Sequence, residues 1–204
     1  MSTAAGTQRL YDERAEKYEG MMWGSGDKKA VDYVFRNLGF HLPPQPRILD
    51  IGCGTGLATR TLKEVFPKSI IYGLDNSGEM LTRYHEEFPQ ATAIEQNFQR
   101  GIPLPDSSID MAVSSASVSE YGNDKTLQDI HRILKNNSAF VNIGVKKNPI
   151  TLVVTSLMWR YRPTTQEEFS RSCLEAGFSQ VSPINLPWRT YPANRMRFAV
   201  MARK

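Results

Sequence analysis

Apolar runs and amphipathic stretches alternate along this chain. Positions 48–51 and 70–74 are almost entirely apolar, which is typical of strands buried in a sheet. Between such runs, apolar residues recur at helical spacing, as in the stripe formed by Val31, Val34, Phe35 and Leu38. Strand and helix patterns that alternate in this way predict a parallel sheet with helices on both faces.

Capping residues, glycines and prolines set the expected limits of these elements. Asp27 is the expected cap of the helix that carries the stripe, and Gly39 is expected to end it. A capping box made by Thr165 and Glu168 predicts a further helix that ends before Gly177. Other helices are expected at 57–66, 77–88 and 125–134, and other strands at 92–95, 139–145, 181–186 and 196–202.

Glycine occupies alternate positions directly after the first apolar run, at Gly52, Gly54 and Gly56. Glycine allows a positive φ and lets a ligand approach the backbone closely, because it has no Cβ. The second run ends in Asp75, where an acid is placed to hold the two hydroxyls of a ribose. The pattern therefore predicts a nucleoside-binding βαβ unit. A dinucleotide fingerprint would need a third glycine at 57, and Leu57 stands there instead.

The segment 48–56, Ile-Leu-Asp-Ile-Gly-Cys-Gly-Thr-Gly, closely resembles the first motif of the class I S-adenosylmethionine (SAM)-dependent methyltransferases. Four later segments resemble this family in the family's order, and with the first motif the similarity covers roughly 45–204; they are 77–81, 102–113, 130–135 and 175–178. One departure is Lys135-Asn-Asn-Ser in place of the usual Lys-Pro-Gly-Gly turn, which asparagine in the left-handed region can still form.

The resemblance implies a Rossmann-like, doubly wound α/β fold. Its seven-stranded sheet would be mostly parallel, with an antiparallel last strand inserted in the sheet and helices on both faces. It also implies SAM as the cofactor and S-adenosylhomocysteine (SAH) as its product. A single domain, 1–204, would then comprise lid helices (1–44), a SAM-binding core (45–145), a capping segment (146–163), and a C-terminal helix and strand pair (164–204).

Cofactor contacts follow from the same resemblance. The implied cofactor-binding residues are Tyr18, Asp50, Gly52, Cys53, Gly54, Asp75, Asn76, Met80, Asn97, Phe98 and Ser115. Asn97 would accept the adenine amino group in place of the family's acid, or be an ordinary turn residue. Met80 would flank the adenine, or belong to the core. Cys53 is expected to be there because a small residue fits the loop, rather than as a catalytic thiolate.

Substrate contacts are expected from aromatic residues around the cleft. Tyr11 and Tyr18 lie on one face of a segment that resembles the family's lid helix, and simple packing of that helix is the alternative. The capping segment is too apolar for a plain loop, so it is expected to cap the substrate or to pack against the sheet edge. The expected substrate-contacting residues are Tyr11, Trp23, Trp159 and Trp188.

Glu120 and Tyr121 are the candidate catalytic residues, because they follow the fourth strand at the carboxyl end of the sheet. Many relatives place a histidine pair where Ser119 and Glu120 stand. Glu120 would act as general base if burial raises its pKa, and the alternative is a solvated acid. Because the methyl of SAM leaves a sulfonium, transfer by direct displacement needs neither an acid nor a metal. The three histidines are expected to be non-catalytic.

Charge and composition narrow the choice of partner. The net charge is +4, and it divides into +9 for 130–204 and −5 for 1–129. A positive rim for an anionic partner is one interpretation, and ordinary drift of surface charge is the other. Two cysteines without metal-type spacing, no long apolar stretch and no visible signal peptide favour a cytoplasmic protein.

The sequence therefore predicts a methyltransferase that acts on an O, N or C nucleophile of a small-molecule substrate. Nucleic acid is the less favoured partner, because the fourth strand is followed neither by the Asn/Asp-Pro-Pro-aromatic loop of DNA adenine methyltransferases nor by the Pro-Cys nucleophile of cytosine-5 enzymes. Two alternatives stay open. One is a methyltransferase of RNA or another macromolecule that uses the basic half, and the other is a non-catalytic SAM-binding sensor or accessory protein.

Overall fold

The structure is a computed structural model that describes residues 26–204 except 160 and 162. The expected lid helix, with Tyr11, Tyr18 and Trp23, lies outside these described residues. No helix in this part of the chain is long and apolar enough to cross a membrane.

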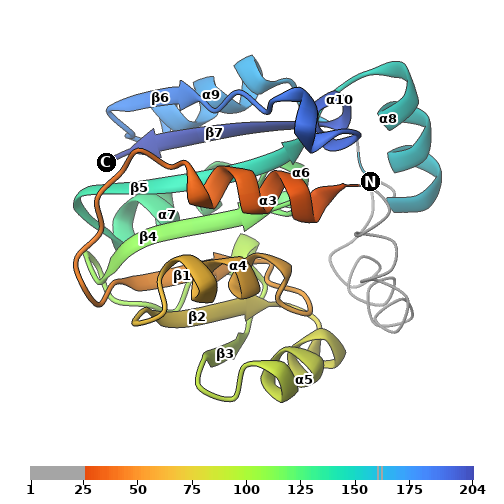
Figure 1. Ribbon diagram of the computed structural model, residues 1–204. Coiled ribbons are helices and arrows are strands. Elements are labelled where there is room, and N and C mark those ends of the chain that lie inside the picture. The colour runs from red at the N-terminus through yellow and green to blue at the C-terminus, as the bar shows by residue number, and fades with distance from the viewer. Residues whose placement is uncertain (1–25, 160, 162) are drawn as a thin grey trace.

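A seven-stranded sheet forms the centre of the molecule (Figure 1). Its strand order is β3-β2-β1-β4-β5-β7-β6. The strands are β1 (Arg47–Ile51), β2 (Ile70–Asp75), β3 (Thr92–Glu95), β4 (Ile109–Ser115), β5 (Leu134–Val145), β6 (Gln180–Pro183) and β7 (Arg197–Arg203). All neighbours pair in parallel except that β7 is antiparallel to both β5 and β6. The doubly wound sheet with an inserted antiparallel last strand is confirmed.

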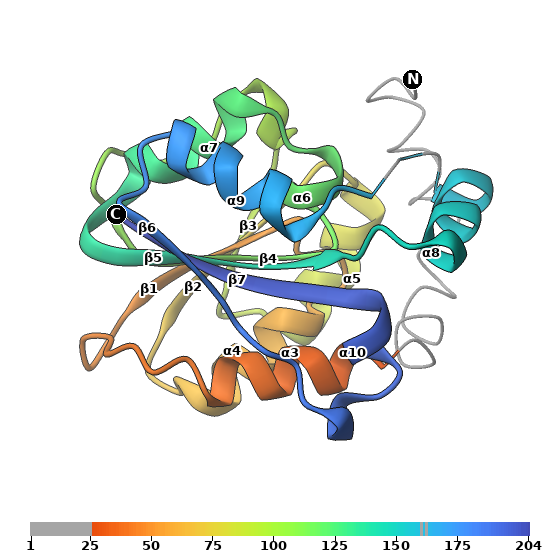
Figure 2. The same cartoon turned by 90° about the horizontal axis from the view of Figure 1, so that it is seen from above.

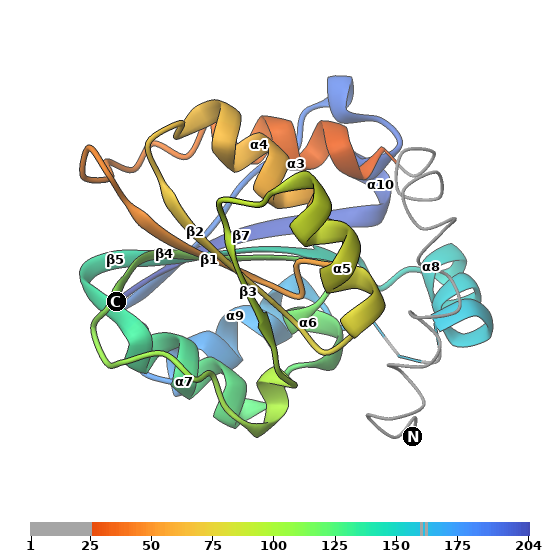
Figure 3. The same ribbon diagram turned by 90° about the horizontal axis from the view of Figure 1, so that it is seen from below.

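Helices cover both faces of the sheet (Figure 2). One face carries α3 (Asp27–Arg36), α4 (Leu57–Val65) and α5 (Gly78–Glu87), whose buried residues share one core cluster. The other carries α6 (Val118–Tyr121), α7 (Asp124–Ile133) and α9 (Gln166–Glu175). Figure 3 shows α5 beside β3, at that edge of the sheet. Because α4 and α5 lie on the same face, Thr59 of α4 can contact Tyr84 of α5 close to the glycine loop.

Beyond the carboxyl end of β5, the capping segment forms α8 (Pro149–Val154) and a π-helical turn (Thr155–Trp159) (Figure 2). Thr151 and Thr155 are buried on its inner side, whereas Ile150, Val153 and Leu157 are exposed. The capping segment is therefore largely helical, with its threonines buried and several apolar residues exposed. Three short helices complete the described fold, namely η1 (Phe98–Arg100), η3 (Trp188–Thr190) and α10 (Ala193–Met196).

Two details at the start of α3 correct the sequence prediction. Gly26, not Asp27, is the N-cap, and it has a φ of 75° in the left-handed region. A Cβ at Gly26 would lie 2.8 Å from Pro192 Cδ, so glycine suits this position. Asp27 becomes the first helical residue because its carboxylate pairs with Arg197 in β7. The helix also ends at Arg36, earlier than the glycine at 39 had suggested.

Other local predictions are confirmed. Thr165 Oγ1 accepts from Glu168 N at 3.1 Å, and Glu168 Oε2 accepts from Thr165 N at 2.8 Å, which completes the predicted capping box. Asn137 has a φ of 59°, so asparagine does take the left-handed conformation where the family has glycine. By contrast, strand β6 ends at Pro183, three positions before the limit predicted from the sequence.

Candidate cofactor site and catalytic cleft

The glycine loop leaves β1 and leads into α4, and its backbone explains the alternating glycines. Gly52, Gly54 and Gly56 have φ values of 68°, 52° and 99°. A Cβ at Gly52 would collide with the side chain of Ser117, and one at Gly56 would collide with the ring of Phe88. The glycines therefore allow both the turn and its close packing against the segments that follow β4 and α5.

Asp75 joins the end of β2 to this loop. Its Oδ2 accepts a hydrogen bond from Gly54 N at 2.9 Å, and its Oδ1 accepts one from Ser77 N at 3.0 Å. The loop is further fixed to β2 because Gly52 N and Cys53 N both donate to Leu74 O, at 2.7 and 3.1 Å. The acid predicted to hold a ribose thus lies against the glycine loop.

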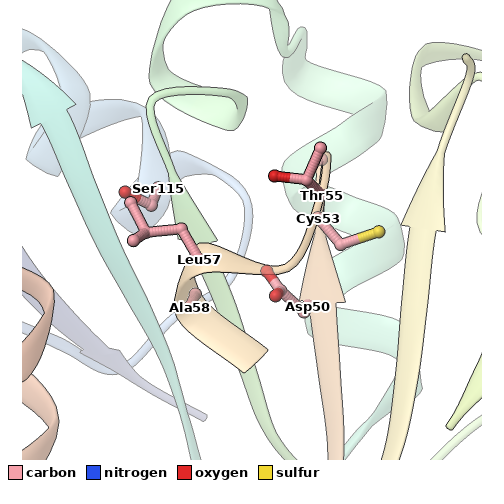
Figure 4. A pocket seen from close by; sticks show the side chains of 7 residues that line it. Asp50, Cys53, Thr55, Leu57, Ala58 and Ser115 are labelled. Carbon is pink, nitrogen blue, oxygen red and sulfur yellow. The ribbon is translucent and has the colours of Figure 1, made fainter. Parts of the chain in front are cut away.

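A pocket opens between the glycine loop, the start of α4 and the end of β4 (Figure 4). Its lining residues are Asp50, Gly52, Cys53, Thr55, Leu57, Ala58 and Ser115. The chain order of the strands reverses between β1 and β4, and ligands of open α/β sheets bind at such a switch point beyond the carboxyl ends of the strands. Four predicted cofactor residues, Asp50, Gly52, Cys53 and Ser115, are brought together here.

Asp50 is a buried carboxylate at this pocket, with only 1% of its surface exposed. Its Oδ2 accepts a hydrogen bond from Thr59 Oγ1 at 2.8 Å, and Thr59 Oγ1 lies 3.1 Å from the Tyr84 hydroxyl. Burial raises the pKa of Asp50 to about 7, an effect that the Thr59 hydrogen bond opposes and the nearby Asp75 charge strengthens.

Thr59 and Tyr84 are not among the cofactor-binding residues predicted from the sequence. The available signal was a polar residue on the sheet-facing side of an amphipathic helix.

Cys53 lies beside Asp50 and is also buried. Burial raises the pKa of its thiol well above the ordinary value, and the Asp75 and Asp50 charges raise it further. A thiol held protonated is a weak nucleophile, so the environment disfavours a catalytic thiolate at this position.

The residues predicted for the adenine side have clear structural partners. Met80 is 1% exposed, and its backbone N donates to Ser77 Oγ at 3.2 Å, while Asn76 is half-buried just before this cap. Asn97 Oδ1 accepts from Gln99 N at 2.9 Å and caps the short helix η1, whose first residue, Phe98, packs in the second core cluster. Contacts of Met80, Asn97 and Phe98 with adenine stay predictions.

Glu120 and Tyr121 are carried by the short helix α6, which follows β4. Glu120 Oε1 accepts from Val145 N at 2.7 Å, and its Oε2 accepts from Ser119 Oγ at 2.8 Å. Burial raises the pKa of Glu120, although these hydrogen bonds and the Arg197 charge oppose the rise. The rings of Tyr121 and Tyr161 pack edge to face, with their centroids 5.1 Å apart. Neither residue lines the pocket of Figure 4, and the Glu120 carboxylate bonds to the end of β5.

Residues 48–137 match the family model described as a methyltransferase domain. Over these residues the chain carries a methyltransferase domain. The methyl donor of this family is SAM, and the glycine loop, Asp50 and Asp75 all lie within the matched segment.

Two curated relatives and one solved structure illustrate the similarity. A trans-aconitate 2-methyltransferase of Rhodopseudomonas palustris is 38% identical over 63 residues, which cover 31% of this chain and 25% of the relative. A malonyl-[acyl-carrier protein] O-methyltransferase of Magnetococcus marinus is 31% identical over 125 residues, covering 56% and 44%. The chain thus spans a quarter to under a half of the length of these relatives. A SAM-dependent methyltransferase of Thermotoga maritima shares the fold, with a TM-score of 0.75 at 17% identity over 97% and 99% of the two chains.

Trp188, a predicted substrate contact of this methyltransferase domain, is not among the residues that line the pocket. Trp188 is 84% exposed on η3, where the neighbouring Arg189 stacks over the Tyr33 ring of α3 at 4.8 Å. Trp159 ends the π-helical turn, and its side chain is not among those described. The pKa of His131 is lowered by burial and by Lys204, and its ring packs edge-on against Phe178. No cluster of metal-ligating side chains occurs within the described ranges.

Proposed function

We propose that this domain transfers the methyl group of SAM to a small-molecule nucleophile by direct displacement. The observation that carries the proposal is the position of Asp75, whose carboxylate lies within hydrogen-bond distance of the glycine loop beside the Asp50 pocket. A carboxylate at the end of β2 suits two ribose hydroxyls, and a buried carboxylate at the end of β1 suits a cationic amino group. The described residues therefore fit the two polar ends of SAM.

SAM, when bound, supplies a methyl group on a positively charged sulfur. The sulfur leaves as a neutral thioether, so no acid has to protonate it. The chain has to hold the cofactor, align the nucleophile and exclude water. Alignment of this kind is worth about 7–11 kcal/mol. The rigid glycine loop and the buried β1–β4 junction supply fixed positions for the cofactor, and α6 and the capping segment supply the surfaces on the substrate side.

We further propose a carboxylate oxygen as the acceptor. Both relatives named above have names that describe methyl transfer to an organic acid or an acyl group. A carboxylate is already ionised at neutral pH, so it needs no general base. This suits a domain in which Ser119 and Glu120 replace the histidine pair and the Glu120 carboxylate already accepts two hydrogen bonds. Glu120 stays the candidate base if the acceptor carries a proton, and Tyr121 stays a candidate for substrate contact.

The basic C-terminal half gives less support to a nucleic-acid substrate. Several of its cations have internal partners among the described residues: Arg132 pairs with Asp106 and Asp129, Lys135 with Asp110, Arg197 with Asp27, and Lys204 Nζ bonds to carbonyl oxygens. Cations that are held in this way are less able to neutralise phosphates.

Transfer of radioactivity from SAM labelled in its methyl group tests this proposal. The acceptor panel should contain tricarboxylates, including trans-aconitate, and malonyl thioesters, with phenols and amines as comparison classes. We expect labelled methyl esters, which are recognised by their release in mild base. Labelled phenols or amines alone would refute the carboxylate acceptor, and binding of SAH without any transfer would favour the non-catalytic sensor.

A further inference from the structure

Tyr84 lies behind the cofactor pocket in a space that the sequence leaves open for it. It is fully buried on α5, and its ring crosses β2 at Gly73. A Cβ at Gly73 would lie 2.5 Å from Tyr84 Cζ, so any other residue would displace the ring. The Phe88 ring packs against Tyr84 with centroids 5.2 Å apart. The Tyr84 hydroxyl is thereby directed at Thr59 on α4.

The hydrogen bonds from Tyr84 to Asp50 have one direction. Thr59 has a single hydroxyl proton, and it donates this proton to Asp50 Oδ2 at 2.8 Å. At the contact of 3.1 Å between Thr59 Oγ1 and the Tyr84 hydroxyl, the tyrosine must therefore be the donor. The backbone N–H of Thr59 also stabilises the charged form of Asp50. The Tyr84 hydroxyl thus donates to the Thr59 hydroxyl, and the Thr59 hydroxyl donates to the Asp50 carboxylate.

Stability alone does not account for this arrangement. Thr59 and Tyr84 have no exposed surface, and Asp50 has 1%. Buried polar groups that are replaced together by apolar groups of similar shape often leave stability unchanged or improved. The one member of the series that lines the pocket is Asp50.

We propose that Thr59 and Tyr84 are positioning residues that orient the Asp50 carboxylate and favour its anionic form, so that it can bind the cationic amino group of the cofactor. This inference rests on the proposed function, because it takes SAM or SAH as the ligand of the Asp50 pocket. It adds two residues outside the glycine loop to the machinery that selects the cofactor.

Among the described residues, the titratable groups that face Asp50 are Asp75 from β2, Cys53 from the loop and Tyr84 from α5. The pKa of Tyr84 is raised by burial and that of Cys53 lies well above its ordinary value, so both stay neutral near pH 7. Asp50, with a pKa of about 7, is then the group that changes charge in the neutral range. A cationic ligand binds the ionised form, so its affinity rises with pH up to the point where Asp50 is fully ionised.

Calorimetric titration with SAH between pH 6 and pH 8.5 provides the test. The variants are Tyr84→Phe, Thr59→Val, Thr59→Ser and the double variant Tyr84→Phe/Thr59→Val. Tyr72→Phe is the matched control, because Tyr72 precedes Gly73 in β2 and packs against the core cluster on the opposite face. The carbon-13 chemical shift of the Asp50 carboxyl group, followed against pH without ligand, reports its pKa independently of binding.

We expect Tyr84→Phe to weaken SAH binding by about 3- to 10-fold at pH 7, the range for loss of one hydrogen bond. The loss should shrink to within about twofold at pH 8.5, where Asp50 is ionised in both proteins. Thr59→Val should lose more and Thr59→Ser should retain near-normal affinity. Because Tyr84 acts through Thr59, adding Tyr84→Phe to Thr59→Val should change nothing further.

Three outcomes overturn the inference. They are equal affinity of Tyr84→Phe and the wild type at every pH, a loss that does not depend on pH, and an additive loss in the double variant. If Tyr84→Phe does not fold, the comparison of Thr59→Val with Thr59→Ser carries the same test. Failure of the proposed function is distinct from these, because the wild type itself would then not bind SAH.

Discussion

Asp27 and Arg197 form a buried, two-pronged ion pair between the first described helix and the inserted strand. Arg197 Nε and Nη2 donate to the two carboxylate oxygens of Asp27 at 2.5 and 2.7 Å. The two residues are 170 positions apart in the chain, so the pair joins α3 to β7 across the sheet. The same arginine lies near enough to Glu120 to affect its pKa. The pair therefore places a framework arginine close to Glu120, the candidate base.

Breaking this pair should destabilise the domain strongly. Arg197→Ala leaves the Asp27 carboxylate buried without its partner, which costs roughly 3–5 kcal/mol. Urea unfolding measures the free energy of unfolding. Arg36→Ala is the matched control, because its ion pair with Glu64 is about half exposed and should contribute under about 1 kcal/mol. Equal effects of the two substitutions would contradict a special role for the buried pair.

Asp75 should carry much of the affinity for the cofactor. Asp75→Ala removes hydrogen bonds from a charged acceptor, worth about 1.5–3 kcal/mol, or roughly 10- to 100-fold in the dissociation constant for SAM. Glu79→Ala is the control, since Glu79 is an exposed acid on the adjoining helix whose carboxylate lies 3.8 Å from Arg83 Nε. An unchanged dissociation constant in a folded Asp75→Ala protein would reject the ribose assignment.

Asp50 should make the folded protein less stable as the pH rises, which is the reverse of the usual effect of a carboxylate. Its pKa is about 7 in the folded protein, against an ordinary value of 3.8 for an aspartate side chain. The folded state thus holds a proton that the unfolded state releases between these values, and its stability falls as pH rises through that window. Asp50→Asn abolishes this dependence, so it should raise the melting temperature relative to the wild type more at pH 8 than at pH 5. A larger gain at pH 5 would show that the sign is wrong.

Glu120 should not control cofactor binding. Glu120→Gln retains shape and removes the negative charge, so SAH affinity should barely change. With a carboxylate acceptor we expect kcat to fall by less than about 10-fold, because no proton has to be removed. A fall of about 10²–10⁴-fold would instead identify Glu120 as the general base for a protonated acceptor. Tyr121→Phe probes the same side of the cleft, and a strong loss of SAH affinity in either variant would show that α6 belongs to the cofactor half.

The alternation of strands and helices, the glycine loop and the position of Asp75 at the end of β2 could be predicted because their signals are local, whereas the antiparallel last strand was implied only by the family resemblance. Each local signal is a short apolar run or a turn whose glycines are needed by its own backbone. The left-handed conformation of Asn137 was also predictable from a local signal, because asparagine tolerates a positive φ in a turn.

The features that sequence analysis missed depend on tertiary packing. Asp27 has the side chain of a helix cap, but Arg197, far along the chain, takes its carboxylate. Thr59 and Tyr84 meet only because α4 and α5 cover the same face of the sheet. No local sequence pattern predicts that the Thr59 hydroxyl of one helix will contact the Tyr84 hydroxyl of another.

The most direct test of the account is a calorimetric titration of the wild-type protein with SAM, SAH and NAD. The third glycine of a dinucleotide loop is replaced by Leu57, and this side chain lines the pocket. We predict that SAM and SAH bind to one site per chain and that NAD produces no heat of binding at the same concentrations. Binding of NAD without binding of SAM would contradict the account at its centre.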